Sequence, residues 1–178
     1  MRNSYDPADV QRTIEQLAAR IAAAFDANQP LNIVGIRTRG EVLAQRLTSM
    51  LQQKHSFTHT GRGVLDITLY RDDLRRHAVR AVGQTREPVG GIDGRRVVLV
   101  DDVLFSGRTI RAALDALSDF GRPSMIRLAV LVDRGGRELP IQPDFVGVTL
   151  SDVPKDHRVN VRFSEIDDKD EITVEPRS

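Results

Sequence analysis

The richest chemistry in this sequence lies just after a short apolar run, Arg96 to Val100. Two adjacent carboxylates come first, then a small hydroxyl-and-glycine loop, and then the start of a predicted helix. The segment consists of Asp101, Asp102, Val103, Leu104, Phe105, Ser106, Gly107, Arg108 and Thr109. Backbone N–H groups at a helix start, together with the helix dipole, form a site for a monophosphate. Because the two carboxylates suit sugar hydroxyls or a hydrated Mg²⁺, the segment predicts a site for a phosphorylated ribose.

Thr38, Arg39 and Gly40 form a second polar segment of this kind. They follow the apolar run Leu31 to Ile36 and precede another predicted helix. Their N–H groups and the Arg39 guanidinium would supply the several donors that a pyrophosphate needs; an exposed polar turn is the alternative. The Gly-Lys-Ser/Thr sequence of a P-loop is absent, which excludes a triphosphate site of that class.

Two further charged segments stand at the ends of predicted strands. They are Tyr70, Arg71, Asp72 and Asp73, which precede a polar stretch, and Asp133 with Arg134, which follow the apolar run 125–132. A charge cluster at a strand end is usually solvated. On the residues alone, Asp133 and Arg134 equally fit a surface ion pair.

Apolar periodicity predicts the elements that position these residues. Spacings of three and four predict helices, and short apolar runs bounded by turn residues predict strands. The predicted helices are Asp6 to Asn28, Val42 to Leu51 and Thr109 to Phe120, and the predicted strands are Leu31 to Ile36, Val64 to Tyr70, Arg96 to Val100 and Met125 to Val132. This alternation predicts an α/β fold, a central parallel sheet flanked by helices on both faces. Ligands of such sheets bind beyond the carboxyl ends of the strands, where the polar segments lie.

Two regions interrupt or follow this alternation. Residues 74–95 are polar and Gly-rich, which predicts a flexible loop. Residues 145–178 carry short β-favourable pieces at 145–150, 159–163 and 172–174, which predict a β-rich tail. The basic residues of the tail fit RNA binding or, more ordinarily, charged positions on a solvated strand edge. We expect residues 1–178 to form a single domain.

The composition narrows the class of protein. The chain has 178 residues, 40% hydrophobic and 29% charged, which is enough for one domain with a substantial core. The net charge of +1 excludes nucleic-acid binding through a polybasic tail. Of the 26 basic residues 23 are Arg, which suits bidentate phosphate contacts but fits the codon bias of a GC-rich genome equally well. The absence of cysteine excludes a disulfide framework and a cysteine nucleophile.

With no apolar stretch of membrane-spanning length and no signal-peptide pattern, we expect a cytoplasmic protein without a membrane partner.

Four ordered segments resemble known sequences. The string from Val97 to Thr109 resembles the phosphoribosyl pyrophosphate (PRPP) loop of type I phosphoribosyltransferases. Val34 to Gly40, Asp66 to Asp73 and Leu131 to Ile141 resemble the corresponding strings of the PyrR family, pyrimidine-operon attenuators that also have uracil phosphoribosyltransferase activity. The resemblance implies a type I phosphoribosyltransferase fold with a small hood and a flexible lid loop.

The resemblance also implies roles for the polar segments. Residues 101–109 would bind PRPP, residues 38–40 would bind pyrophosphate, residues 70–73 would form the base of the lid, and residues 133–134 would contact the nucleotide or base. The implied reaction converts uracil and PRPP to UMP and pyrophosphate, with Mg²⁺ held by Asp101 and Asp102, directly or through water. A homodimer or a higher homo-oligomer is implied as well.

Binding of pyrimidine-operon leader mRNA under UMP control is the second implied function, and here the sequence departs from the family. Similar RNA-binding members carry a Thr-Arg pair and a His on the first helix, and a His at the turn after Arg134. The residues at these positions are Glu15, Gln16, Ala19 and Gly136. Arg37 and Arg137 remain as candidate RNA contacts. Because the loss of cationic and donor groups removes phosphate contacts, we expect RNA attenuation to be weakened, rerouted or absent.

Two alternative functions stay open on the sequence. A transferase for a purine base such as hypoxanthine would share the PRPP loop, because the choice of base lies in the more divergent hood. A nucleotide-sensing, RNA-binding regulator that has lost catalysis would keep the same loop for binding alone.

Overall fold

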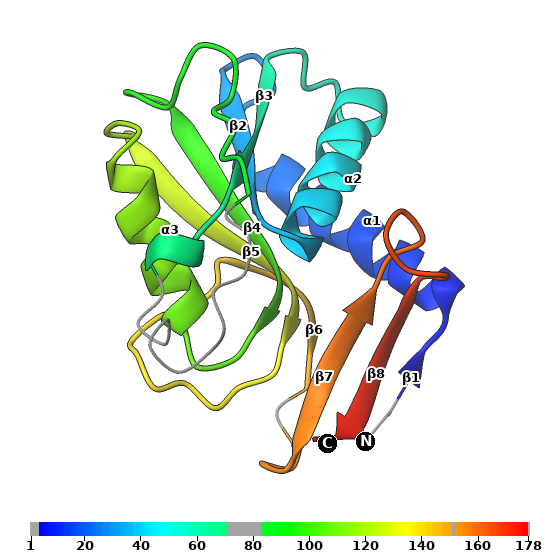
Figure 1. Cartoon of the computed structure of the whole chain (residues 1–178). Coiled ribbons are helices and arrows are strands. Elements are labelled where there is room, and N and C mark those ends of the chain that lie inside the picture. The colour runs from blue at the N-terminus through cyan, green and yellow to red at the C-terminus, as the bar shows by residue number, and fades with distance from the viewer. Residues whose placement is uncertain (1–3, 71–82, 151, 178) are drawn as a thin grey trace.

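The apolar runs form one parallel sheet in the computed structural model, which describes residues 4–70, 83–150 and 152–177 (Figure 1). Its strands are β2 (Leu31–Ile36), β3 (Thr60–Leu65), β4 (Arg96–Leu104), β5 (Met125–Asp133) and β6 (Phe145–Thr149). Their order is β3-β2-β4-β5-β6, and every neighbouring pair is parallel. The predicted α/β fold with a central parallel sheet is confirmed.

Helices cover both faces of this sheet. α1 (Pro7–Ala24) and α2 (Arg39–Lys54) pack on one face, and α3 (Arg108–Ser118) packs on the other. Consecutive strand residues therefore enter different cores, so that Val98 lies with α1 and α2 whereas Val97 lies with α3. Within the described ranges, no helix is long and apolar enough to cross a bilayer.

β4 is longer than the sequence predicts. The apolar run ends at Val100, but the strand continues to Leu104, because its pairing with β5 runs on until Leu104 faces Asp133. Asp101 and Asp102 therefore lie within the strand rather than in the loop that follows it. The loop itself begins at Phe105.

The predicted strand over residues 64–70 is also corrected. β3 ends at Leu65, and a 3₁₀ turn, η1 (Thr68–Tyr70), follows it. The Asp66 carboxylate accepts the N–H groups of Thr68 and Gly83 at 2.8 and 2.5 Å, which turns the chain out of the sheet. The predicted flexible loop over 74–95 is described from residue 83 onward, and residues 71–82 lie outside the described part of the chain.

The predicted β-rich tail divides between two sheets. β6 forms an edge of the main sheet, whereas β7 (His157–Arg162) and β8 (Glu171–Pro176) join β1 (Ser4–Tyr5) in an antiparallel sheet of order β1-β8-β7. We call this second sheet the hood sheet. Two residues are too short to show a period, so the sequence does not predict β1. Val161 and Ile172 pack in the same core as α1, which fixes the hood sheet against that helix.

The turn between β7 and β8 is anchored to α2 by Arg46. Its Nε donates to Glu165 Oε1 at 2.8 Å, and its Nη1 donates to Asp170 Oδ2 at 2.5 Å. The guanidinium carbon lies 4.9 Å from the centre of the Phe163 ring, and the side chain is only 14% exposed. The hydrogen bonds from Arg46 hold the pKa values of Asp170 and Glu165 below their ordinary values.

We expect Arg46→Ala to lower the free energy of unfolding by about 2 kcal/mol, because it leaves a largely buried carboxylate without its cation. Since the two carboxyl pKa values are lowered on folding, this stabilisation is present above the unfolded values, about 4, and is lost as the pH falls through the folded values. Urea denaturation between about pH 7 and about pH 2 measures the effect. Arg62→Ala, at an exposed arginine of β3, is the control. If Arg46→Ala lowered the free energy of unfolding by the same amount at about pH 2 as at about pH 7, the prediction would be wrong.

Candidate active site

β4 delivers the two predicted carboxylates to the carboxyl edge of the main sheet. Asp101 is buried, its Oδ1 accepts the Asp102 N–H at 3.0 Å, and its side chain interacts with that of Asp102. Asp102 is half-buried and lines a cavity. Burial raises the pKa of Asp102, and the contacts with Asp101, the Val103 N–H and the charge of Arg39 offset this only in part. A further cation beside Asp102 would therefore favour its ionised form.

The loop between β4 and α3 consists of Phe105, Ser106 and Gly107. Gly107 has a φ of 91°, in the left-handed region that favours glycine, and this conformation lets the chain turn directly into α3. The Ser106 carbonyl accepts the N–H groups of Glu138 and Leu139 at 3.0 and 3.2 Å, which fixes the loop. Ser106 Oγ accepts the Arg108 N–H at 3.4 Å, and the N-cap residue Gly107 has no side chain that could cap the start of α3. An anion there would meet backbone N–H groups and the positive end of the helix dipole.

The other members of the predicted PRPP-binding segment flank this loop. Val103 is half-buried, and Leu104 is buried in the core beneath α3. Thr109 is half-buried in the first turn of α3. Arg108 is exposed, and its Nε donates to Glu138 Oε2 at 2.7 Å.

The predicted pyrophosphate segment lies at the start of α2. Thr38 is exposed, Arg39 is half-buried and Gly40 is buried. Gly40 packs so closely against β4 that a Cβ atom there would lie 2.6 Å from the Val100 carbonyl oxygen. Backbone packing therefore requires this glycine, and the same close approach brings Arg39 next to Asp102.

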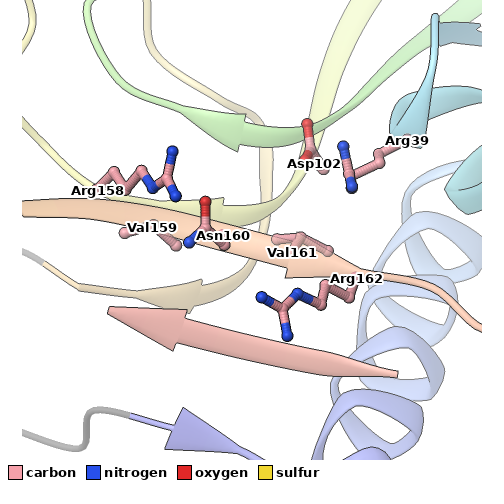
Figure 2. Close-up of a pocket in the computed structure, with 7 residues that line it drawn as sticks. All are labelled: Arg39, Asp102, Arg158, Val159, Asn160, Val161 and Arg162. Atoms are coloured by element: carbon pink, nitrogen blue, oxygen red, sulfur yellow. The ribbon is translucent and has the colours of Figure 1, made fainter. Parts of the chain in front are cut away.

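Arg39 and Asp102 line one cavity of about 310 Å³ at this edge of the sheet. Its other lining residues are Arg158, Val159, Asn160, Val161 and Arg162, all from β7. Figure 2 shows Asp102 and Arg39 next to each other across the cavity from β7. Three arginines and one carboxylate, supplied by α2, β4 and the hood sheet, thus surround a space suited to a polyanion.

The β7 residues are the part of the site that the sequence reasoning missed. Arg158 and Arg162 fitted a solvated strand edge, but both line the cavity. Together with Asn160 they alternate along the strand and share one face, where Asn160 Nδ2 donates to Glu175 Oε2 at 2.7 Å. The alternation of polar residues along β7 was the signal available in the sequence. Alternation alone does not show which part of the protein this face of the strand packs against.

Arg134 lies just beyond β5 and is 5% exposed. Its guanidinium carbon lies 4.0 Å from the centre of the Phe105 ring, and its Nη2 donates to the carbonyls of Pro154 and His157 at 3.1 and 2.8 Å. Arg134 therefore connects the β4–α3 loop to the hood sheet. This placement contradicts the alternative of a surface ion pair with Asp133.

Asp133 pairs instead with Arg137, whose Nη2 donates to Asp133 Oδ2 at 2.8 Å. The Nε and Nη1 of Arg137 donate to the carbonyls of Ile141 and Phe105, each at 2.9 Å. All three nitrogens of this candidate RNA contact are thus engaged within the protein. Arg37, the other candidate, is exposed.

The predicted base of the lid is described only in part. Tyr70 lies in η1, where its hydroxyl donates to Asp119 Oδ2 at 2.5 Å, and this hydrogen bond raises the pKa of Tyr70. The other three predicted residues, Arg71, Asp72 and Asp73, lie outside the described residues.

The four positions that depart from the RNA-binding pattern lie in two places. Gln16 and Ala19 are exposed on α1, where Glu15 is engaged in an ion pair with a lysine of α2. Gly136 has a φ of 76°, and a Cβ atom there would lie 2.5 Å from the Phe105 ring. A larger residue at position 136 would require the Phe105 ring to move.

Comparison with solved structures shows the fold. The hypoxanthine phosphoribosyltransferase of Trypanosoma cruzi has a TM-score of 0.70 to this chain, at 18% sequence identity, over 100% of this chain and 98% of that chain. A hypoxanthine-guanine phosphoribosyltransferase from Bacillus anthracis also has a TM-score of 0.70, at 15% identity, over 98% of each chain.

Comparison of sequences shows the family. Residues 5–165 match the family described as Phosphoribosyl transferase domain. The Bifunctional protein PyrR of Leifsonia xyli subsp. xyli is 51% identical over 172 residues, which cover 94% of this chain and 93% of that protein. The Bifunctional protein PyrR of Mycobacterium tuberculosis is 46% identical over 180 residues, which cover 97% and 92%. With its parallel sheet and its cavity at the carboxyl edge, the chain belongs to the PyrR family of type I phosphoribosyltransferases.

Proposed function

We propose that this protein transfers the phosphoribosyl group of PRPP to uracil, giving UMP and pyrophosphate. The observation that carries the proposal is the convergence of Arg39 and Asp102 on one cavity, lined also by β7, at the carboxyl edge of the sheet. Membership of the PyrR family supports the choice of uracil as the accepting base.

The residues of this chain act by position and charge. The β4–α3 loop and the start of α3 hold the 5′-phosphate, Asp101 and Asp102 hold the ribose hydroxyls, and Arg39 holds the pyrophosphate. The bond between the ribosyl carbon C1 and the pyrophosphate oxygen breaks through an oxocarbenium-like state, and its electron pair leaves with pyrophosphate. Uracil N1 bonds to C1, and the proton that N1 carried is released to solvent. Cationic groups aimed at the leaving pyrophosphate stabilise the charge that develops there, so no covalent nucleophile is required.

Mg²⁺ is the proposed cofactor. The donor set fits it, because the Asp102 carboxylate lines the cavity and the buried Asp101 carboxylate lies beside it. The described residues contain no group of three or more side chains that could hold a metal without substrate. Mg²⁺ is commonly held by one or two carboxylates together with substrate phosphates and water. Asp101 and Asp102 would hold it in this way, directly or through water. When bound, the ion would neutralise charge on the pyrophosphate.

We propose that any regulatory contact with pyrimidine-operon leader mRNA is weak. Arg137 is engaged within the protein, and the exposed side chains at positions 16 and 19 of α1 carry no positive charge. Arg37 remains exposed for such a contact. Homo-oligomerisation and a cytoplasmic location, which follow from the family resemblance and the composition, stay predictions.

We expect uracil to be the only base that releases pyrophosphate when the protein is mixed with PRPP and Mg²⁺. Cytosine, hypoxanthine and guanine complete the panel, and removal of Mg²⁺ with a chelator should stop the release. Product with a purine would replace the proposal with a purine phosphoribosyltransferase. No product with any base, together with UMP binding, would favour the regulator that has lost catalysis.

We expect Asp102→Asn to lower kcat/KM for PRPP by about 100-fold or more, because it removes a charge that faces the reacting groups. The thermal midpoint should not fall, since burial already disfavours the ionised carboxyl at this position. Asp115→Asn, at an exposed position of α3, is the control. Unchanged turnover in Asp102→Asn would show that the ribose site lies elsewhere.

Leader RNA should bind weakly, with a dissociation constant above about 1 µM near physiological salt, as for non-specific binding. Filter-binding titrations with and without UMP measure this affinity. Gln16→Arg, which adds a cation to the exposed face of α1, should tighten binding and steepen its salt dependence. Tight, UMP-enhanced and salt-sensitive binding by the unaltered protein would refute the prediction.

A further inference from the structure

Arg39 reaches the cavity with a buried donor unsatisfied. Its Nη2 donates to Asp167 Oδ1 at 2.9 Å. Its Nε is buried and has no hydrogen-bond acceptor among the described residues. Because a buried donor without an acceptor is costly, and because Arg39 lines the cavity beside Asp102, an anion in the cavity is the natural acceptor for Nε.

Asp167 is held in place by its own turn between β7 and β8. Its Oδ2 accepts the Phe163 N–H at 2.9 Å, and its backbone N–H donates to the Phe163 carbonyl at 2.6 Å. Arg46, two helical turns beyond Arg39 on α2, holds the same segment through Glu165 and Asp170. The Asp167 carboxylate therefore meets Arg39 without rearrangement.

We infer that Asp167 is a positioning residue, which orients the Arg39 guanidinium toward the pyrophosphate of PRPP. The inference rests on the proposed function. An unrestrained arginine side chain would lose rotamer freedom when the substrate binds. Asp167 imposes that loss already in the folded protein, and such preorganisation favours binding. The carboxylate engages Nη2, and the Nε–H has no acceptor among the described residues, so Arg39 keeps a donor that a phosphate oxygen could satisfy.

A carboxylate beside an arginine could also compete with pyrophosphate for it. The geometry favours positioning, because the contact joins one Asp167 oxygen to one Arg39 nitrogen, and the second Asp167 oxygen is engaged by Phe163. The two roles predict opposite effects. Loss of a positioning carboxylate raises the KM for PRPP, whereas loss of a competitor lowers it.

The test is Asp167→Asn, which keeps an acceptor for the Phe163 N–H but removes the charge that Arg39 contacts. Steady-state kinetics with PRPP and uracil should show the KM for PRPP raised about tenfold, kcat changed by less than about twofold and the KM for uracil unchanged. Glu165→Gln is the matched control. It lies on the same segment but pairs with Arg46, and it should leave all three constants unchanged.

A purely structural role would not give this pattern, because both substitutions weaken the attachment of the same segment and would lower the thermal midpoint alike. In an Arg39→Lys background, Asp167→Asn should change the KM for PRPP by less than about twofold, since it acts through Arg39. An unchanged or lowered KM for PRPP in Asp167→Asn, or an equal rise in Glu165→Gln, would overturn the inference.

Asp167→Glu replaces Asp167→Asn if the latter does not fold. It keeps the charge but displaces the carboxylate by one methylene, and it should raise the KM for PRPP at least about threefold; an unchanged KM again overturns the inference. Wild-type turnover separates the two proposals. If the wild type releases no pyrophosphate with any base, the proposed function fails, whereas normal wild-type turnover with unaltered Asp167 variants removes only the positioning role.

Discussion

The parallel direction of the strands in the main sheet is the constraint on which the site depends. Because neighbouring strands run the same way, their carboxyl ends lie at one edge, and α2 and α3 both begin there. Both helices thus present their positive dipole ends at this edge. The close contact of Gly40 with the Val100 carbonyl brings α2 onto β4. Arg39 and Asp102 can therefore line one cavity, although 62 residues separate them in the chain.

The hood sheet closes this space through arginines that make different kinds of contact. Arg46 is paired with carboxylates of the β7–β8 turn, and it fixes the hood sheet to α2. Arg134 is buried and pairs with no carboxylate among the residues that the structure describes. It stacks on Phe105 and donates to the carbonyls of Pro154 and His157, at the start of the hood sheet. Arg158 and Arg162 line the cavity. The β8 carboxylates Glu171 and Glu175 lie within 4 Å of Arg158 and Arg162, so the positive charge at the cavity is partly balanced. Such a local cluster of arginines suits a small polyphosphate better than an extended nucleic acid.

The same contacts bear on the relation between catalysis and RNA binding. Gly136 packs against Phe105, and Arg137 donates to the Phe105 carbonyl. Both residues thereby support the loop that we propose to bind the 5′-phosphate. A turn that holds the β4–α3 loop in this way has fewer side chains to offer to RNA.

Much of this protein could be predicted from local sequence. Strand and helix periods repeat over neighbouring residues, and the strings around Asp102 and Arg39 are contiguous, so the parallel α/β fold and the PyrR family were predicted and are confirmed. The extension of β4 depends on pairing with β5, as far as Leu104 and Asp133. The contact of Arg39 with Asp167 joins residues 128 positions apart. Hydrogen bonds of this range form only when the chain packs, and no local pattern of residues records which partner each group will meet.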